Sequence, residues 1–248
     1  MAELLLIGLC GACVGSFSSM LLYRLPEMRD DDSLTLYGPR SHCTQCKSPL
    51  AMRMLVPVLS FIFLRGKCSF CNKKIGSSYL INELIHIFVI ILIAVNIGVS
   101  VSGFIYYLIF SIFYILFILD LKHLYLPIYL NISLILIGLT TNIFFNLFTS
   151  QQEALLGALA GFLSLWIINA VFKFFRSKDG IGGGDFILLG GLGSIFGVVS
   201  LGPIVLLGSS CSILIYTLSD KSKREEVPLG SGLILGAILF YLIKTLFI

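Results

Sequence analysis

Long apolar segments, separated by short polar ones, follow one another along almost the entire chain. Each is close to the ~20 residues that a helix needs to cross the hydrocarbon core of a bilayer. These segments are expected to be helices, because lipid offers no partner to an open backbone amide. The pattern predicts eight such helices, at 3–23, 80–98, 103–121, 128–148, 154–175, 185–199, 202–218 and 229–247. Since the sixth is short and only "SLGP" separates it from the seventh, the predicted count is seven or eight.

Composition agrees with this pattern. Of the 248 residues, 57% are hydrophobic and 12% are charged, and the mean hydropathy is +1.00. A soluble domain carries about a quarter charged residues, so the class of soluble proteins is excluded. The first apolar segment lacks a basic flank before it and a small-residue cleavage site after it, so we do not interpret it as a removable signal peptide.

The basic residues predict how the chain is oriented. If the amino terminus lies outside, 16 of the 17 Lys and Arg fall on one face, and the positive-inside rule makes that face cytoplasmic. Nine of them lie between Arg24 and Lys74, and the others are Lys122, Lys173, Arg176, Lys178, Lys221, Lys223 and Arg224, with Lys244 alone on the opposite face. Both termini are then outside. The net charge of +4 follows from this bias and requires no nucleic-acid partner.

One long hydrophilic stretch carries four of the seven cysteines, as "CTQC" and "CSFC". The residues are Cys43, Cys46, Cys68 and Cys71, with 21 residues between the pairs. Two such pairs commonly supply four thiolates to one structural zinc ion. Two disulfides or four spare thiols are the alternatives, and a cytoplasmic location disfavours stable disulfides. His42 is expected to be a bystander, because four cysteines complete the ligand shell.

The predicted fold class is therefore an all-α polytopic membrane protein, with about eight transmembrane helices and a zinc-binding cytoplasmic loop domain. Its predicted parts are the first transmembrane helix (1–23), the cytoplasmic tetracysteine domain (24–79) and a transmembrane domain (80–248). Cys10 and Cys13 also have the C-x-x-C spacing, but they lie among small residues of the first helix. We interpret them as packing residues, because small residues let membrane helices approach closely.

Three acidic residues belong to predicted membrane helices or their cytoplasmic ends: Glu83, Asp120 and Asp185. A carboxylate within a span is costly and is a functional candidate by default, although one at a helix end can also sit among headgroups or cap the helix. The predicted orientation places Asp120 and Asp185 at similar depth near the cytoplasmic side. Two neighbouring carboxyl groups share a proton, which is the apparatus of an aspartic protease. Glycines 182–184 would keep the chain locally unwound and let a peptide backbone approach Asp185.

These motifs, in this order, resemble those of the bacterial type IV prepilin peptidases, which are intramembrane aspartic proteases of the GxGD kind. The resemblance covers nearly the whole chain. It is carried by "VGSFSSMLLYRLP" (14–26), the two cysteine pairs with "LVPVLSFIFLRGKC" (55–68), "YLINEL" (79–84), "DLKHLYLP" (120–127), "GGGDFILLGGLG" (182–193) and "VPLGSGLILGA" (227–237).

The resemblance implies a bifunctional enzyme of the bacterial inner membrane, in which residues 24–79 are associated with methylation and residues 80–248 form the aspartic peptidase domain. Asp120 and Asp185 would be its catalytic pair, with Gly182, Gly183 and Gly184 forming the loop beside them. It would cleave the leader of prepilins or pseudopilins at the cytoplasmic face and methylate the new amino terminus with S-adenosylmethionine. Glu83 is a candidate for methylation or substrate docking, or for a structural role at a helix end. The residues that bind S-adenosylmethionine are not identifiable from the sequence, nor is the oligomeric state.

Three alternatives remain open at this point. A peptidase that only cleaves is one, although the resemblance places the cysteine loop with the methylating members. A proton-coupled transporter would also carry membrane carboxylates, but the chain has no recognisable inverted repeat. A zinc-bearing membrane scaffold without catalysis would tolerate the loss of both aspartates.

Overall fold

The computed structural model describes residues 2–31, 33–218 and 226–247, and the regular structure in them is helical throughout. The elements are α1 (Ala2–Glu27), η1 (Met52–Met54), α2 (Leu59–Phe63), α3 (Ser78–Asn96), α4 (Val101–His123), α5 (Ile128–Phe145), α6 (Gln151–Arg176), α7 (Gly183–Phe196), η2 (Val198–Ser200), α8 (Leu201–Leu218) and α9 (Leu229–Phe247). Lys221, Lys223 and Arg224, which contribute to the predicted orientation, lie outside the described residues.

Within the described part of the chain, seven helices are long and apolar enough to cross a membrane. They correspond to seven of the eight predicted spans, and the all-α membrane fold is confirmed. The remaining predicted span, the sixth, is α7, which has only 14 residues. Its length of about 21 Å falls short of the ~30 Å hydrocarbon core.

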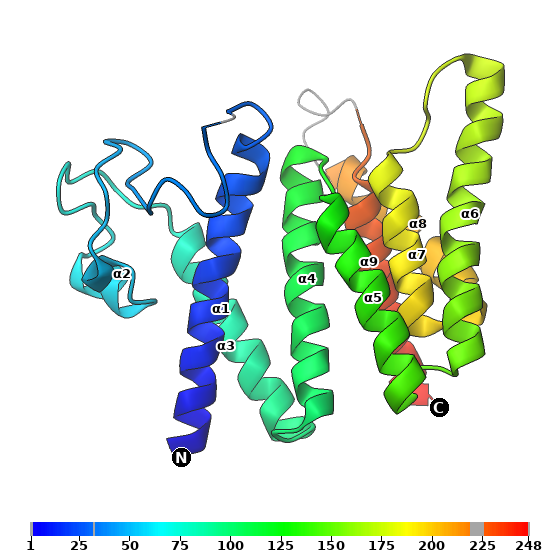
Figure 1. Ribbon diagram of the computed structural model, residues 1–248, viewed down its shortest axis with the longest axis horizontal. Helices are drawn as coiled ribbons and strands as arrows, with labels where there is room; N and C mark the ends of the chain where they lie inside the picture. Colours follow the sequence, from blue (N-terminus) through cyan, green and yellow to red (C-terminus); the bar gives the residue numbers. More distant parts are fainter. Residues whose placement is uncertain (1, 32, 219–225, 248) are drawn as a thin grey trace. The chain divides into compact units, whose positions relative to one another are not determined.

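The chain forms two compact units, residues 1–111 and 112–248, and each is described by itself. In the first unit α1 packs along α3 (Figure 1). The helices touch at Gly15, where an added Cβ would lie 2.6 Å from the Cα of Glu83. Small residues therefore set this contact, as predicted, but the two cysteines do not. Cys10 and Cys13 are exposed, because they lie on the faces of α1 turned away from α3, so their interpretation as packing residues was wrong.

In the second unit α7 packs against both α5 and α6, and α8 pairs with α9 (Figure 1). The approach of α6 to α7 is so close that a Cβ at Gly157 would collide with the carbonyl of Gly193. From Phe186 to Phe196 every residue of α7 except Ile187 is buried. The short helix is thus enclosed by its neighbours.

Asn142, on α5, closes the far end of α7. Its Nδ2 donates to the carbonyls of Ser194 and Ile195, at 2.9 Å each. Its Oδ1 accepts from the amides of Phe148 and Thr149, at 3.0 and 3.2 Å. The last carbonyls of a helix have no partner within the helix. One fully buried side chain therefore satisfies two of them where α7 ends.

Candidate active site and metal site

Asp120 lies in the last turn of α4 and is buried. Two hydrogen bonds reach it from Ser231, whose amide and hydroxyl lie 2.5 and 2.7 Å from the Oδ2 atom of Asp120. Ser231 is the third residue of α9, so its amide is one of the first-turn donors that the helix itself leaves free. The positive end of α9 therefore faces the Asp120 carboxyl group.

Asp185 is the third residue of α7 and its amide donates to the carbonyl of Gly182 at 3.0 Å. Among the described residues, its buried Oδ1 atom has no hydrogen-bond partner. Asn131, fully buried on α5, donates to the carbonyl of Gly184 at 3.2 Å, and its own Oδ1 is likewise without a partner in the described part. Two unpaired oxygens thus lie at the start of α7.

Leu126 joins the surroundings of the two aspartates. An added Cβ on Gly184, next to Asp185, would lie 2.7 Å from the Cβ of Leu126. A Cβ on Gly230, next to Ser231, would lie 2.7 Å from the Cδ1 of Leu126 and 3.2 Å from the Cγ of Asp120. The first turns of α7 and α9 therefore meet at one side chain.

The three glycines before Asp185 do not form an unwound loop as a group, and this part of the prediction was wrong. Gly183 and Gly184 are the first two residues of α7, and only Gly182 has extended backbone as the residue before it. Leu126 packs against Gly184 where a side chain would otherwise lie, and we infer that this contact compensates for the low helix propensity of glycine. Gly183 is exposed, and no described atom lies within 4 Å of the position of its Cβ.

Asn169, on α6, anchors the segment that leads into α7. Its Oδ1 accepts from the amides of Gly180 and Ile181, at 2.8 and 3.0 Å, and its Nδ2 donates to Asp179 at 3.0 Å. Asp179 also pairs with Lys173 at 2.9 Å. Lys173 and Asn169, in that order of strength, hold the pKa of Asp179 below its usual range.

Ser231, Asn131 and Asn169 were all missed at the level of the sequence. Each is a buried polar side chain within an apolar helix. Such residues are costly in a membrane unless they find partners, so their polarity was the available signal. Which partners they find depends on contacts between distant helices.

The four cysteines predicted to bind metal are brought together by the structure. Their Sγ atoms all lie within 4.8 Å of one another, and none of these cysteines forms a disulfide. The cluster could hold a metal ion. His42 is not part of it, and its Nδ1 lies 3.0 Å from the carbonyl of Arg40.

Two matching turns place the sulfurs. Lys47 follows the first pair and Asn72 the second, both with left-handed backbone, at φ of 57° and 55°. In each turn the amide of that residue donates to the carbonyl of the first cysteine, at 2.9 Å. The same local geometry thus turns both pairs inward. The hydroxyl and amide of Ser48 lower the pKa of Cys46 to about 6, which favours the thiolate that a metal requires.

Glu83 lies in the second turn of α3, which begins at Ser78, and is buried. It is therefore not at the helix end. Its Oε2 accepts a hydrogen bond of 2.7 Å from the amide of Val58. This contact ties the α3 carboxylate to the segment between the cysteine pairs.

Comparison with known proteins covers the same two parts of the chain. Residues 9–97 match the family described as bacterial peptidase A24 N-terminal domain, and residues 105–218 match the type IV leader peptidase family. Proteins named prepilin leader peptidase/N-methyltransferase are similar over most of their length. That of Pectobacterium carotovorum subsp. carotovorum is 31% identical, over 91% of this chain and 87% of the relative. That of Neisseria gonorrhoeae is 32% identical, over 95% and 89%, and that of Klebsiella pneumoniae 35%, over 81% and 88%. No solved structure matches the chain.

Proposed function

This chain belongs to the type IV leader peptidase family, and from that premise we propose that it removes the leader peptide of type IV prepilins or pseudopilins. The reaction is placed at the cytoplasmic face of a bacterial inner membrane, on the basis of the distribution of basic residues. The observation that carries the proposal is the position of Leu126, which contacts both Gly184, next to Asp185, and Gly230, which lies beside Asp120.

The surroundings of the two aspartates support different roles for them. Two donors from Ser231 converge on one oxygen of Asp120, and an ionised carboxylate is the form that only accepts. Asp120 is therefore the base that takes a proton from water. Asp185 has a buried oxygen to which no described residue is hydrogen-bonded, which leaves it able to donate a proton to the scissile carbonyl oxygen. When the peptide bond breaks, the leaving amine takes the proton that Asp120 holds, and Asp185 recovers its proton from one hydroxyl of the tetrahedral intermediate as the new carboxyl group forms.

The names of the relatives support a second activity, N-methylation of the newly formed amino terminus. S-adenosylmethionine, when bound, supplies a methyl group on a sulfonium centre. The transfer moves a methyl group to an amine and hydrolyses no peptide bond. It therefore requires a binding site for the methyl donor in addition to the aspartate pair.

We assign the tetracysteine cluster a structural zinc ion. Four thiolates make a closed shell with no open position for substrate. Cys43, Cys46, Cys68 and Cys71 would hold the ion, and its contribution would be to fold the segment around them.

The test is cleavage of a purified prepilin by the full-length protein in liposomes, followed by mass spectrometry. Asp120→Asn and Asp185→Asn are each expected to lower cleavage at least ~100-fold, since each removes a group that transfers a proton. Asp179→Asn is the matched control, because Asp179 is exposed and lies in the loop before α7. Full cleavage by either of the first two variants would refute the aspartate mechanism. A mass gain of one methyl group, dependent on S-adenosylmethionine, tests the second activity.

A further inference from the structure

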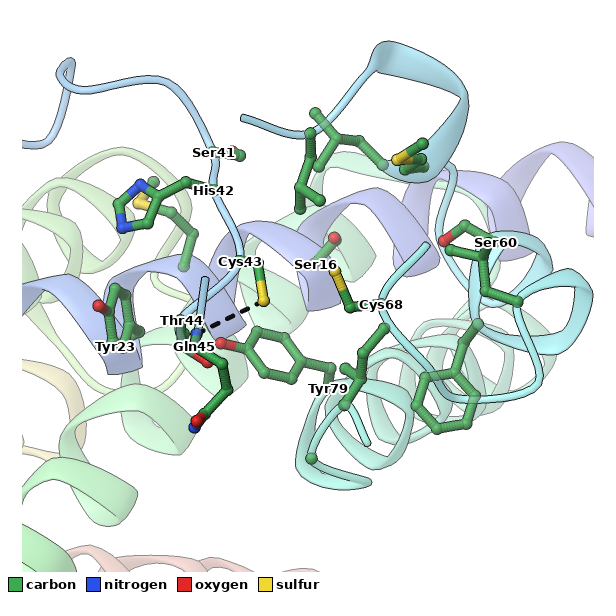
Figure 2. A pocket seen from close by; sticks show the side chains of 18 of the residues that line it. Ser16, Tyr23, Ser41, His42, Cys43, Thr44, Gln45, Ser60, Cys68 and Tyr79 are labelled. Atoms are coloured by element: carbon green, nitrogen blue, oxygen red, sulfur yellow. Dashed lines mark hydrogen bonds between the residues drawn. The ribbon is translucent and has the colours of Figure 1, made fainter. Parts of the chain in front are cut away.

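A cavity of about 210 Å³ opens in the first unit between α1, α3 and the two cysteine pairs (Figure 2). It is separate from the aspartate pair, and Cys43 and Cys68 of the tetracysteine cluster form part of its wall. We propose that this cavity binds the methyl donor, S-adenosylmethionine, an inference that rests on the proposed methylation. Three features of its lining match the chemistry of a nucleoside that carries a sulfonium cation and an amino-acid carboxylate.

The first feature is a buried carboxylate. Among the described residues that line the cavity, Glu83 carries the single carboxyl group. The contact of Gly15 with its backbone fixes its position. Its partners are the Val58 amide and the Ser16 hydroxyl. A hydroxyl rotates freely enough to release the carboxylate to a cation or a ribose hydroxyl.

The second feature is aromatic. Tyr23 and Tyr79 both line the cavity, and Figure 2 shows the Tyr79 ring next to Cys43. The face of an aromatic ring attracts an organic cation, most strongly where water is excluded. Apolar side chains complete the wall and suit an adenine ring: Met20, Leu50, Leu55, Phe61 and Leu64.

The third feature is basic. Lys73 and Lys74 line the same cavity and are exposed. The amino-acid carboxylate of S-adenosylmethionine, if directed at these two lysines, would be attracted by their positive charge. The cavity thus offers a carboxylate and aromatic rings in its wall and a positive rim. The buried Arg24 also lines it, but its guanidinium donates to the backbone carbonyls of Thr35 and Pro39.

A strained turn beside Glu83 supports a functional role for this region. The amide of Leu59 donates to the carbonyl of Pro57 at 2.6 Å, which closes a γ-turn around Val58. Val58 is β-branched and has φ of 60°, a conformation that such residues rarely adopt. The turn directs the Val58 amide at Glu83. Strain of this kind persists where a site requires it.

The experiment is equilibrium dialysis of radiolabelled S-adenosylmethionine against the zinc-loaded, full-length protein in detergent. Glu83→Gln and Tyr79→Ala are expected to raise Kd by about tenfold or more, from loss of a charged partner and of a ring. Tyr79→Phe keeps the ring and should bind like the wild type. Glu153→Gln, on α6 in the other unit, and Asp120→Asn should leave Kd unchanged.

Zinc content and thermal unfolding are measured on every variant, and leader cleavage on every variant except Asp120→Asn, so that loss of folding is recognised. If Glu83→Gln fails that control, the comparison of Tyr79→Ala with Tyr79→Phe decides. Wild-type protein that methylates while Glu83→Gln and Tyr79→Ala retain its Kd would overturn the assignment of the cavity and leave the proposed function intact. Wild-type protein that neither binds the donor nor methylates would instead refute the proposed methylation.

Discussion

Ser231 directs its amide and its hydroxyl at the same oxygen of Asp120, although 111 residues separate the two in the chain. The hydroxyl has one proton and also lies 3.2 Å from the carbonyl of Phe117. The shorter distance, 2.7 Å, assigns the proton to Asp120. Ser231 is therefore a positioning residue for the proposed base.

Removal of this hydroxyl should slow catalysis without weakening substrate binding. Ser231→Ala keeps the amide donor and loses one hydrogen bond to a charged group, worth about 1.5–3 kcal/mol. We expect kcat for prepilin cleavage to fall about 10- to 100-fold and KM to stay nearly constant. Ser200→Ala is the control, since that buried hydroxyl donates to the carbonyl of Phe196, four residues earlier, at 2.7 Å. An equal loss in both variants would show a general packing effect.

Gly184 and Gly183 should respond differently to the same substitution. The added methyl of Gly184→Ala would lie 2.7 Å from the Cβ of Leu126, inside the normal contact distance between carbons. We expect a loss of about 1–3 kcal/mol of stability and a fall in cleavage. Gly183→Ala meets no described atom and should be neutral or slightly stabilising. Thermal unfolding in detergent measures both, and Leu126→Ala should rescue Gly184→Ala. Equal melting temperatures for the two single variants would contradict the packing argument.

Asn169 should control the order of the segment that enters α7. Asn169→Ala leaves the amides of Gly180 and Ile181 without their acceptor. We expect trypsin to cut after Lys178 about tenfold faster, because each lost hydrogen bond contributes about 1 kcal/mol. Asn96→Ala, which removes an exposed amide bonded within its own helix, is the control. An unchanged rate of cutting would mean that the anchor does not order this segment.

The pH dependence of the same segment follows from Asp179. Its pKa is lowered in the folded protein, so its contribution is fully present above its ordinary value of about 3.9 and is lost only as pH falls through the lower folded value. Hydrogen exchange at Gly180 and Ile181, corrected for intrinsic rates, should therefore show equal protection at about pH 7 and pH 5. Loss of protection between those two values would show that another group controls the segment.

Removal of the metal should unfold the tetracysteine segment, and the three cysteines outside it should not be needed for metal binding. Cys68→Ser, or a chelator, is expected to abolish bound zinc, since metal binding and local folding are coupled in such sites. Elemental analysis of the purified protein measures the metal. Cys211→Ser, on α8, should retain it. Zinc that persists in Cys68→Ser would exclude a four-thiolate site.

Periodicity and composition were sufficient for the all-helical membrane fold, because each apolar segment carries its own signal. The cysteine cluster was also predictable, since matched local turns after Cys46 and Cys71 need no distant contact. The proximity of Ser231 to Asp120 was not predictable. It depends on how α9 packs against α4, and no local pattern encodes that register.

Gly184 shows a second feature that the sequence alone could not predict. This residue was interpreted as leaving room for a substrate, whereas the space is occupied by Leu126, from the segment between α4 and α5. A glycine in the sequence indicates close approach but not which group approaches. The extent of α7 was mistaken for the same reason, because glycine disfavours a helix only when packing does not compensate.

The enclosure of α7 has a consequence for how the protein is made. Helix α7 has 14 residues, and its last carbonyls accept hydrogen bonds from the Asn142 side chain of α5. It is too short to span a bilayer by itself. We expect it to insert into the membrane together with α5 and α6, which precede it in synthesis. The Asn142 side chain on α5 is then already present to donate to the last carbonyls of α7. Ser231 arrives later still, with the final helix. In the proposed mechanism, a chain inserted only as far as α8 carries both aspartates without the two donors of Ser231, so we expect leader cleavage to begin only once α9 is in place.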